Sequence, residues 1–132
     1  MKNYSLIKQS LEKSSFRSKF RLDAEDRAYI HKTGLDTIEK HARDFIEKRL
    51  SIIVPLKDGK QTPFKGHPVF KAQHATATCC RGCLLKWYDI PKDRRLSEQE
   101  SSTISNIIME WIRWNIQLKD AKTKAGEDGR RT

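Results

Sequence analysis

The sequence predicts a mainly α fold, either a small α domain or a small α+β domain, and three observations support this prediction. Two stretches, 37–50 and 98–119, repeat apolar residues at the three- and four-residue spacing of a helix with one buried face. A candidate cap opens each stretch, since Asp36 and Ser97 are each followed three residues later by a glutamate. Only 51–54 is rich enough in β-branched residues to suggest a strand, so we expect at most one short hairpin.

Length and composition predict a single domain. A chain of 132 residues is long enough for one domain with a modest core. We divide it into a basic N-terminal segment (1–15), a globular domain (16–119) and a disordered tail (120–132) that lacks apolar periodicity. No apolar run approaches the roughly 20 residues of a membrane span, and the N-terminus lacks the apolar core of a secretory signal. We therefore expect a cytoplasmic protein.

Two helices are expected before the first long one. One covers residues 4–13. The other lies near 24–32, where Asp23 is a candidate N-cap and Gly34 a C-terminal stop.

The middle of the chain mixes loop and helix. Residues 57–68 hold two prolines, two glycines and an Asp-Gly pair, which are typical of loops. The stretch from His67 to His74 is expected to be extended. A helix near 79–88, capped by Thr78, is then expected to carry the cysteines.

The two long helices are expected to pack on each other, because neither is long enough to be stable alone. The expected contact joins Ile104, Ile108 and Trp111 to Ile38, Phe45 and Ile46, with Trp111 in the core or at its edge.

A cluster of cysteine and histidine is the strongest functional signal. All three cysteines and two of the four histidines lie within 67–83. The candidate metal ligands are His67, His74, Cys79, Cys80 and Cys83. Thiolates and imidazoles are the ligands that zinc prefers, four to a structural site. We therefore expect a metal site, with zinc the favoured ion and iron the alternative, rather than a set of buried apolar cysteines. On an extended strand His67 and His74 face opposite sides, so both bind one ion only if the strand bends.

Two other functions stay open. A metal-dependent hydrolase or nuclease would hold its ion with His67, His74 and one cysteine, and keep an open position. A thiol redox protein would use the three cysteines, whose pKa values fall at a helix N-terminus and beside Arg81 and Lys86. No acid–base pair stands out in the sequence, so metal binding is the first hypothesis.

The charge of the chain favours a polyanionic partner. The formal net charge is +10, and residues 1–21 hold six lysines and arginines against one glutamate. Such a surface attracts nucleic acid by counterion release, although a basic surface also serves solubility alone. The candidate nucleic-acid contacts are Arg17, Lys19, Arg21, Arg81, Lys86, Lys92, Arg94 and Arg95.

A family resemblance rests on FRSKFRL (16–22), GLDTIEKHARDFIEKRL (34–50) and the motif GHPVF-x-AQHATATCC-x-GCL-x-KW (66–87). These segments are similar to a bacterial family that carries a domain of unknown function. The resemblance covers about residues 16–112 and implies no established activity. Its members usually read KWH where this chain has Tyr88 in the third position. The resemblance therefore implies a site made by the histidines and cysteines that match.

Overall fold

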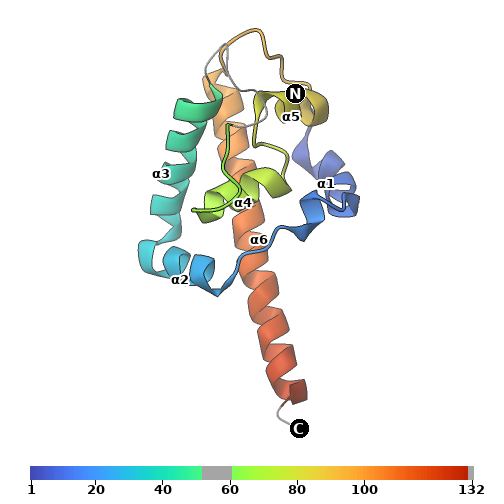
Figure 1. The fold of residues 1–132 in the computed structure, drawn as a ribbon, viewed down its shortest axis with the longest axis vertical. Coiled ribbons are helices and arrows are strands. Elements are labelled where there is room, and N and C mark those ends of the chain that lie inside the picture. Colours follow the sequence, from blue (N-terminus) through green and yellow to red (C-terminus); the bar gives the residue numbers. More distant parts are fainter. Residues whose placement is uncertain (52–60, 131–132) are drawn as a thin grey trace.

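A computed structural model describes residues 1–51 and 61–130, with side chains as far as Gln117. Within these residues the chain is helical and has no strand, so the mainly α prediction is confirmed (Figure 1). The elements in chain order are α1 (Tyr4–Lys13), the short 3-10 turn η1 (Arg17–Lys19), α2 (Ala24–Thr33), α3 (Leu35–Phe45), the π-helix η2 (Ile46–Leu50), α4 (Pro68–Ala75), α5 (Arg81–Tyr88) and α6 (Glu98–Arg130). Residues 52–54 of the expected strand lie outside the described residues. None of the described helices is both long enough and apolar enough to cross a membrane.

The long helix α6 is the axis of the molecule. In Figure 1 it runs behind α4, with α3 on one side and α1 and α5 on the other. It contacts α3, η2 and α4, so the expected packing of the two long helices is confirmed. Ile38 and Ile46 on one side and Ile104 and Ile108 on the other are buried. Trp111 is partly buried and packs against this core at its edge.

Two helices begin with the caps that the sequence predicts. At α2 the side chain of Asp23 accepts the backbone N–H of Asp26, and the Asp26 carboxylate accepts the backbone N–H of Asp23. At α6 Ser97 and Glu100 make the same reciprocal pair, at 3.0 and 2.9 Å. Each of these two capping pairs satisfies backbone N–H groups that a helix start leaves without partners.

Gly34 ends α2, as predicted, with a φ of 90°, a conformation that favours glycine.

Helix α1 covers the predicted residues 4–13. Helix α6 begins at the predicted position and continues beyond 119, where we expected it to end. The disorder predicted for 120–132 stays a prediction.

Helix α3 starts earlier than predicted and changes its pitch before it ends. The turn at Gly34 leads directly into Leu35, so Asp36 lies inside the first turn and is not the cap. The helix then widens into η2, which closes with a hydrogen bond from the backbone N–H of Ser51 to the carbonyl of Ile46, at 2.9 Å. In a π-helix each backbone N–H bonds to the carbonyl five residues earlier, whereas in an α-helix the carbonyl is four residues earlier.

The extended conformation predicted for His67 to His74 is wrong, because this stretch forms α4. His67 alone is extended, and its ring Nδ1 accepts the backbone N–H of Val69 at 3.0 Å. Pro68 occupies the first helical position, where its missing N–H costs nothing and its fixed φ suits a helix. The proline therefore starts a helix here instead of marking a loop.

The start of α5 also differs from the prediction. The N-cap is Cys80, whose Sγ accepts the backbone N–H of Cys83 at 3.4 Å. The expected cap, Thr78, instead pairs its hydroxyl with that of Thr76 at 3.0 Å. The helix thus begins at Arg81, later than expected.

Candidate metal centre

The structure brings all three cysteines together at the start of α5. The Sγ atoms of Cys79, Cys80 and Cys83 lie within 4.8 Å of one another, and Cys79 and Cys83 are 3.6 Å apart. All three are free thiols. Cys79 and Cys80 are buried, whereas Cys83 is partly exposed. Cys83 is therefore the most exposed residue of the cluster.

Two hydrogen bonds hold the turn before α5 in place. The buried hydroxyl of Thr62 donates to the carbonyl of Cys79 at 2.7 Å. The N-cap bond from the Cys83 backbone to the sulfur of Cys80 holds the other end of the cluster. Both contacts fix where the sulfurs point before any ion binds.

Arg17 is the functional residue that the sequence does not reveal. It begins η1, and its guanidinium Nη2 lies 3.1 Å from the Sγ of Cys83 while Nη1 lies 3.5 Å from that of Cys79. Nη1 also donates to the carbonyl of His74 at 2.7 Å. We expected Arg17 to be a surface cation for nucleic acid, but it is committed to the sulfur cluster. Its place in the matching segment 16–22 is the only sequence signal that could have pointed to it.

The three cysteines differ in the direction of their pKa shifts, and only Cys83 has a lowered pKa. Hydrogen bonds from the Cys79 and Cys80 thiols, and then the Arg17 guanidinium, lower the pKa of Cys83 far below its usual value. Hydrogen bonds with Cys80 and Cys83, together with burial, raise the pKa of Cys79. For Cys80 the hydrogen bond with Cys79 acts to lower the pKa, but the bond with Cys83 and burial raise it. Cys83, the cysteine with the lowered pKa, is also the one closest to the Arg17 guanidinium.

His67 lies away from the sulfur group. Its Nδ1 caps α4, and its Nε2 lies 3.0 Å from Nδ1 of His41. The ring also packs against Tyr29 and Phe45. Burial, and then the proximity of His41, lower the pKa of His67 to about 4. Both ring nitrogens have partners, so the expected role of His67 as a ligand beside the cysteines is not supported.

His74 lies closer but is not part of the group either. Its ring is sandwiched between Phe20, at 5.3 Å, and Phe64, at 4.5 Å between centroids. Its Nε2 lies 3.1 Å from the carbonyls of both Thr62 and Pro63, and burial lowers its pKa. Without either histidine in the sulfur group, the hydrolase or nuclease site that needs both on one ion loses its ligands.

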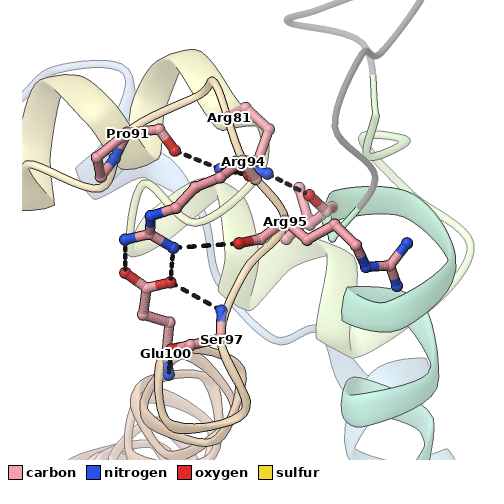
Figure 2. Close-up of polar contacts among 7 residues, drawn as sticks. Arg81, Pro91, Arg94, Arg95, Ser97 and Glu100 are labelled. Carbon is pink, nitrogen blue, oxygen red and sulfur yellow. Dashed lines mark hydrogen bonds and ion pairs between the residues drawn. The ribbon is translucent and has the colours of Figure 1, made fainter.

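Arg81 is a buried structural residue and not a nucleic-acid contact, which corrects the sequence prediction (Figure 2). Its Nη1 donates to the carbonyl of Leu50 at 3.1 Å. Its Nη2 donates to the carbonyls of Pro91 and Arg94. The side chain thereby ties α5 to the end of η2 and to the connection that leads into α6. The sequence shows the charge of this residue but not its burial.

Two further candidate cations, Arg94 and Arg95, contact acidic side chains. Arg94 pairs with both carboxylate oxygens of Glu100, at 2.7 and 2.8 Å, as Figure 2 shows. Arg95 lies 3.0 Å from the carboxylate of Glu47. Among the remaining candidates, Lys92 is partly exposed, and the exposed ones are Lys19, Arg21 and Lys86.

Tyr88, the position where the similar family usually has histidine, is a core residue. Its ring is fully buried and its hydroxyl donates to the carbonyl of Thr76 at 2.5 Å. The departure from the motif therefore lies in the core and outside the sulfur group.

Comparison with known proteins identifies the family. No solved structure matches the chain. The family match spans residues 5–113 and so includes Arg17, the three cysteines and the core that holds them. The chain therefore belongs to the family described as Domain of unknown function (DUF4186).

Proposed function

We propose that this protein binds a soft metal ion, zinc first of all, through Cys79, Cys80 and Cys83. The observation that carries the proposal is the mutual approach of the three sulfurs within 4.8 Å. A tetrahedral zinc site with bonds of about 2.3 Å holds its sulfurs about 3.8 Å apart. The Cys79–Cys83 separation of 3.6 Å is close to that value. The three sulfurs, all within 4.8 Å of one another, would need to approach by at most about 1 Å to reach that geometry.

The electrostatics of the cluster support the same proposal. Three thiolates around a divalent ion leave one net negative charge, and the Arg17 guanidinium already donates to two of the sulfurs. Such N–H···S contacts orient thiolate ligands and offset their charge. Within the described part of the chain no histidine or carboxylate joins the group, so a water or an added ligand would take the fourth position. We also propose the cytoplasm as its location, because free thiols persist in a reducing compartment.

The test is elemental analysis of protein purified without added metal, together with a count of reactive thiols. We expect stoichiometric zinc or iron, and Cys83→Ser should lower the metal content and the melting temperature together, because metal binding contributes to folding. His67→Asn is the matched control and should keep the metal, since His67 lies outside the sulfur group. A wild-type protein that is fully stable and takes up neither metal would overturn the proposal.

Thiol chemistry is the second candidate, because Cys83 is the most exposed cysteine of the three and its pKa is lowered. The Cys79 sulfur lies 3.6 Å from it. On this alternative the purified protein holds no metal, and one thiol is alkylated much faster than the other two at neutral pH. The same elemental analysis and thiol count therefore separate the two candidates.

A further inference from the structure

A stack of rings stands beside the sulfur cluster with one face open to solvent. Phe20, His74 and Phe64 stack in that order, with interplanar angles of 16° and 15°. Phe64, the outer ring, is 61% exposed. The Phe16 ring stands at 89° to the Phe64 ring, with 6.3 Å between the two centroids. Phe16 is 38% exposed. Phe16 and Phe64 thus form a contiguous exposed apolar patch, and such patches often mark binding surfaces.

Cations border these rings. Lys19 Nζ lies 4.8 Å from the centre of the Phe16 ring and 5.9 Å from that of Phe20. Arg21 is exposed and its guanidinium donates to the carbonyls of Ser18 and Phe20 at 2.7 and 3.3 Å. Neither cation makes an ion pair with a described residue. Their charges are therefore available to an anion.

The surface continues into a cavity of about 240 Å³ between α1, η1 and α6. Phe20 and Arg21 line one part of it, and Trp114, which is 50% exposed, lines another. Lys8 lies over the Trp114 ring at 5.0 Å. The cavity thus repeats the pairing of a cation with an exposed ring.

Two carboxylates also line the cavity and limit where a phosphate fits. Glu12 and Glu110 lie close to Tyr4 in this lining. Burial, and secondly the charges of Glu110 and Glu12, raise the pKa of Tyr4 to about 12. Phosphates are therefore expected beside the cations of η1 and its C-terminal flank and not next to these acids.

We propose that this aromatic–basic face, made by Phe16, Lys19, Phe20, Arg21, Phe64 and Trp114, binds single-stranded nucleic acid. Bases stack on Phe64 and Trp114, and phosphates lie beside Lys19 and Arg21. Rings and cations interleaved in this way bind single strands without reading sequence, because every unpaired base offers a face. A duplex hides those faces, so it gains only the phosphate contacts. The proposal does not depend on a metal at the cysteines.

Anisotropy titrations with labelled oligothymidylate, oligouridylate and a duplex of equal length, each at several salt concentrations, test the proposal. Phe64→Ala should weaken single-strand binding at least about fivefold and leave duplex binding unchanged, because it removes one stacking ring. Phe64→Trp keeps a stacking ring and should bind single strands at least as tightly as the wild type does. Lys19→Gln and Arg21→Gln should each flatten the log–log salt dependence on single strands by about 0.7, the contribution of one phosphate contact.

The matched control is Lys40→Gln, which removes the same charge from an exposed position on α3, away from η1 in Figure 1. It should change neither the affinity nor the slope. Circular dichroism of each variant confirms that it is folded. The proposal is overturned if the wild type binds no single strand at the lowest salt concentration. It is also overturned if Phe64→Ala binds as the wild type does, or if Lys40→Gln loses as much affinity as Lys19→Gln.

Discussion

His67 connects two elements through its two ring nitrogens. Because Nδ1 accepts the N–H of Val69, the proton of the neutral ring lies on Nε2, which is 3.0 Å from Nδ1 of His41. A second proton on His67 would remove the acceptor that caps α4. The neutral ring is therefore the form that the fold needs, in agreement with a pKa lowered to about 4.

This lowered pKa makes stability depend on pH. Between about pH 6.5 and 4 the His67 ring binds more protons in the unfolded chain than in the folded one. The contribution of His67 to the free energy of unfolding is therefore complete above pH 6.5 and is lost as the pH falls towards 4. The loss assigned to His67 is on the order of 1–2 kcal/mol, because the ring is only partly buried and solvent screens its interactions. We expect His67→Asn to keep the cap, since asparagine is a good N-cap residue, and to flatten this dependence. Urea unfolding across that pH range measures it, and an unchanged pH profile in the variant would contradict the prediction.

Arg81 should be irreplaceable even by lysine. A lysine has one nitrogen on a flexible stem and does not span the carbonyls of Leu50 and Arg94 as the planar guanidinium does. We expect Arg81→Lys to lower the free energy of unfolding by about 3 kcal/mol, because buried carbonyls lose charged donors. Arg113→Lys, at an exposed position of α6, is the control. A loss below about 1 kcal/mol in urea unfolding would show that Arg81 does not hold these segments together.

The sequence predicts the sulfur cluster but not its counter-charge, and the reason is distance along the chain. Cys79, Cys80 and Cys83 are neighbours in sequence, so local spacing alone places them together. Arg17 reaches them across more than 60 residues, and no local pattern records such a contact. Arg81 misleads for another reason, since arginines are mostly exposed and composition cannot show which one is buried.

At the scale of elements, helices with signals at their start were predictable. The Asp23 and Ser97 caps stand directly before α2 and α6, and both helices begin where expected. Helix α4 was missed because Pro68 serves equally as a loop residue and as a first helical residue. Its end carries no glycine either, since Ala77 takes the left-handed φ of 59°. The π-helix η2 was invisible because apolar spacing over one turn does not separate it from an α-helix.

The cap of α6 should have a measurable energy. Ser97→Ala removes the hydroxyl that accepts the backbone N–H of Glu100. We expect a loss of about 1 kcal/mol in the free energy of unfolding, which is typical of an N-cap serine. Ser102→Ala, at an exposed position inside the same helix, should be neutral or slightly stabilising because alanine has the higher helix propensity. Equal effects of the two changes would rule out a capping role for Ser97.

At the scale of the whole molecule, the sulfur centre depends on a fold that closes across the chain. Arg17 comes from the N-terminal region and the cysteines from the middle, while α6 packs behind the α4 helix that precedes them. A single core joins these parts, with Ile104 and Ile108 of α6 fully buried in it. Loss of the core should therefore release the centre in the same step.

Ile108→Ala tests this coupling. Truncating a fully buried isoleucine should cost about 2–5 kcal/mol. In chelated protein, the slow reaction of the buried Cys79 and Cys80 thiols with a thiol reagent should become fast at the same urea concentration at which circular dichroism shows the helices lost. The wild type should show the same coincidence at higher urea. Thiols that become reactive well before the helices melt would show that the centre opens independently.

The π-helix between Phe45 and Ser51 gives this turn one more residue than an α-helical turn needs. Deleting one residue of η2 would return the turn to α geometry and leave the direction of the chain beyond it nearly unchanged. Lys48 in this turn is exposed, so its removal would take no side chain from the core. Leu50 is buried and its carbonyl accepts a hydrogen bond from Arg81, so its place in the core has to be kept. Members of the family should accordingly accept a one-residue difference in length within this turn, while the position of Leu50 stays apolar.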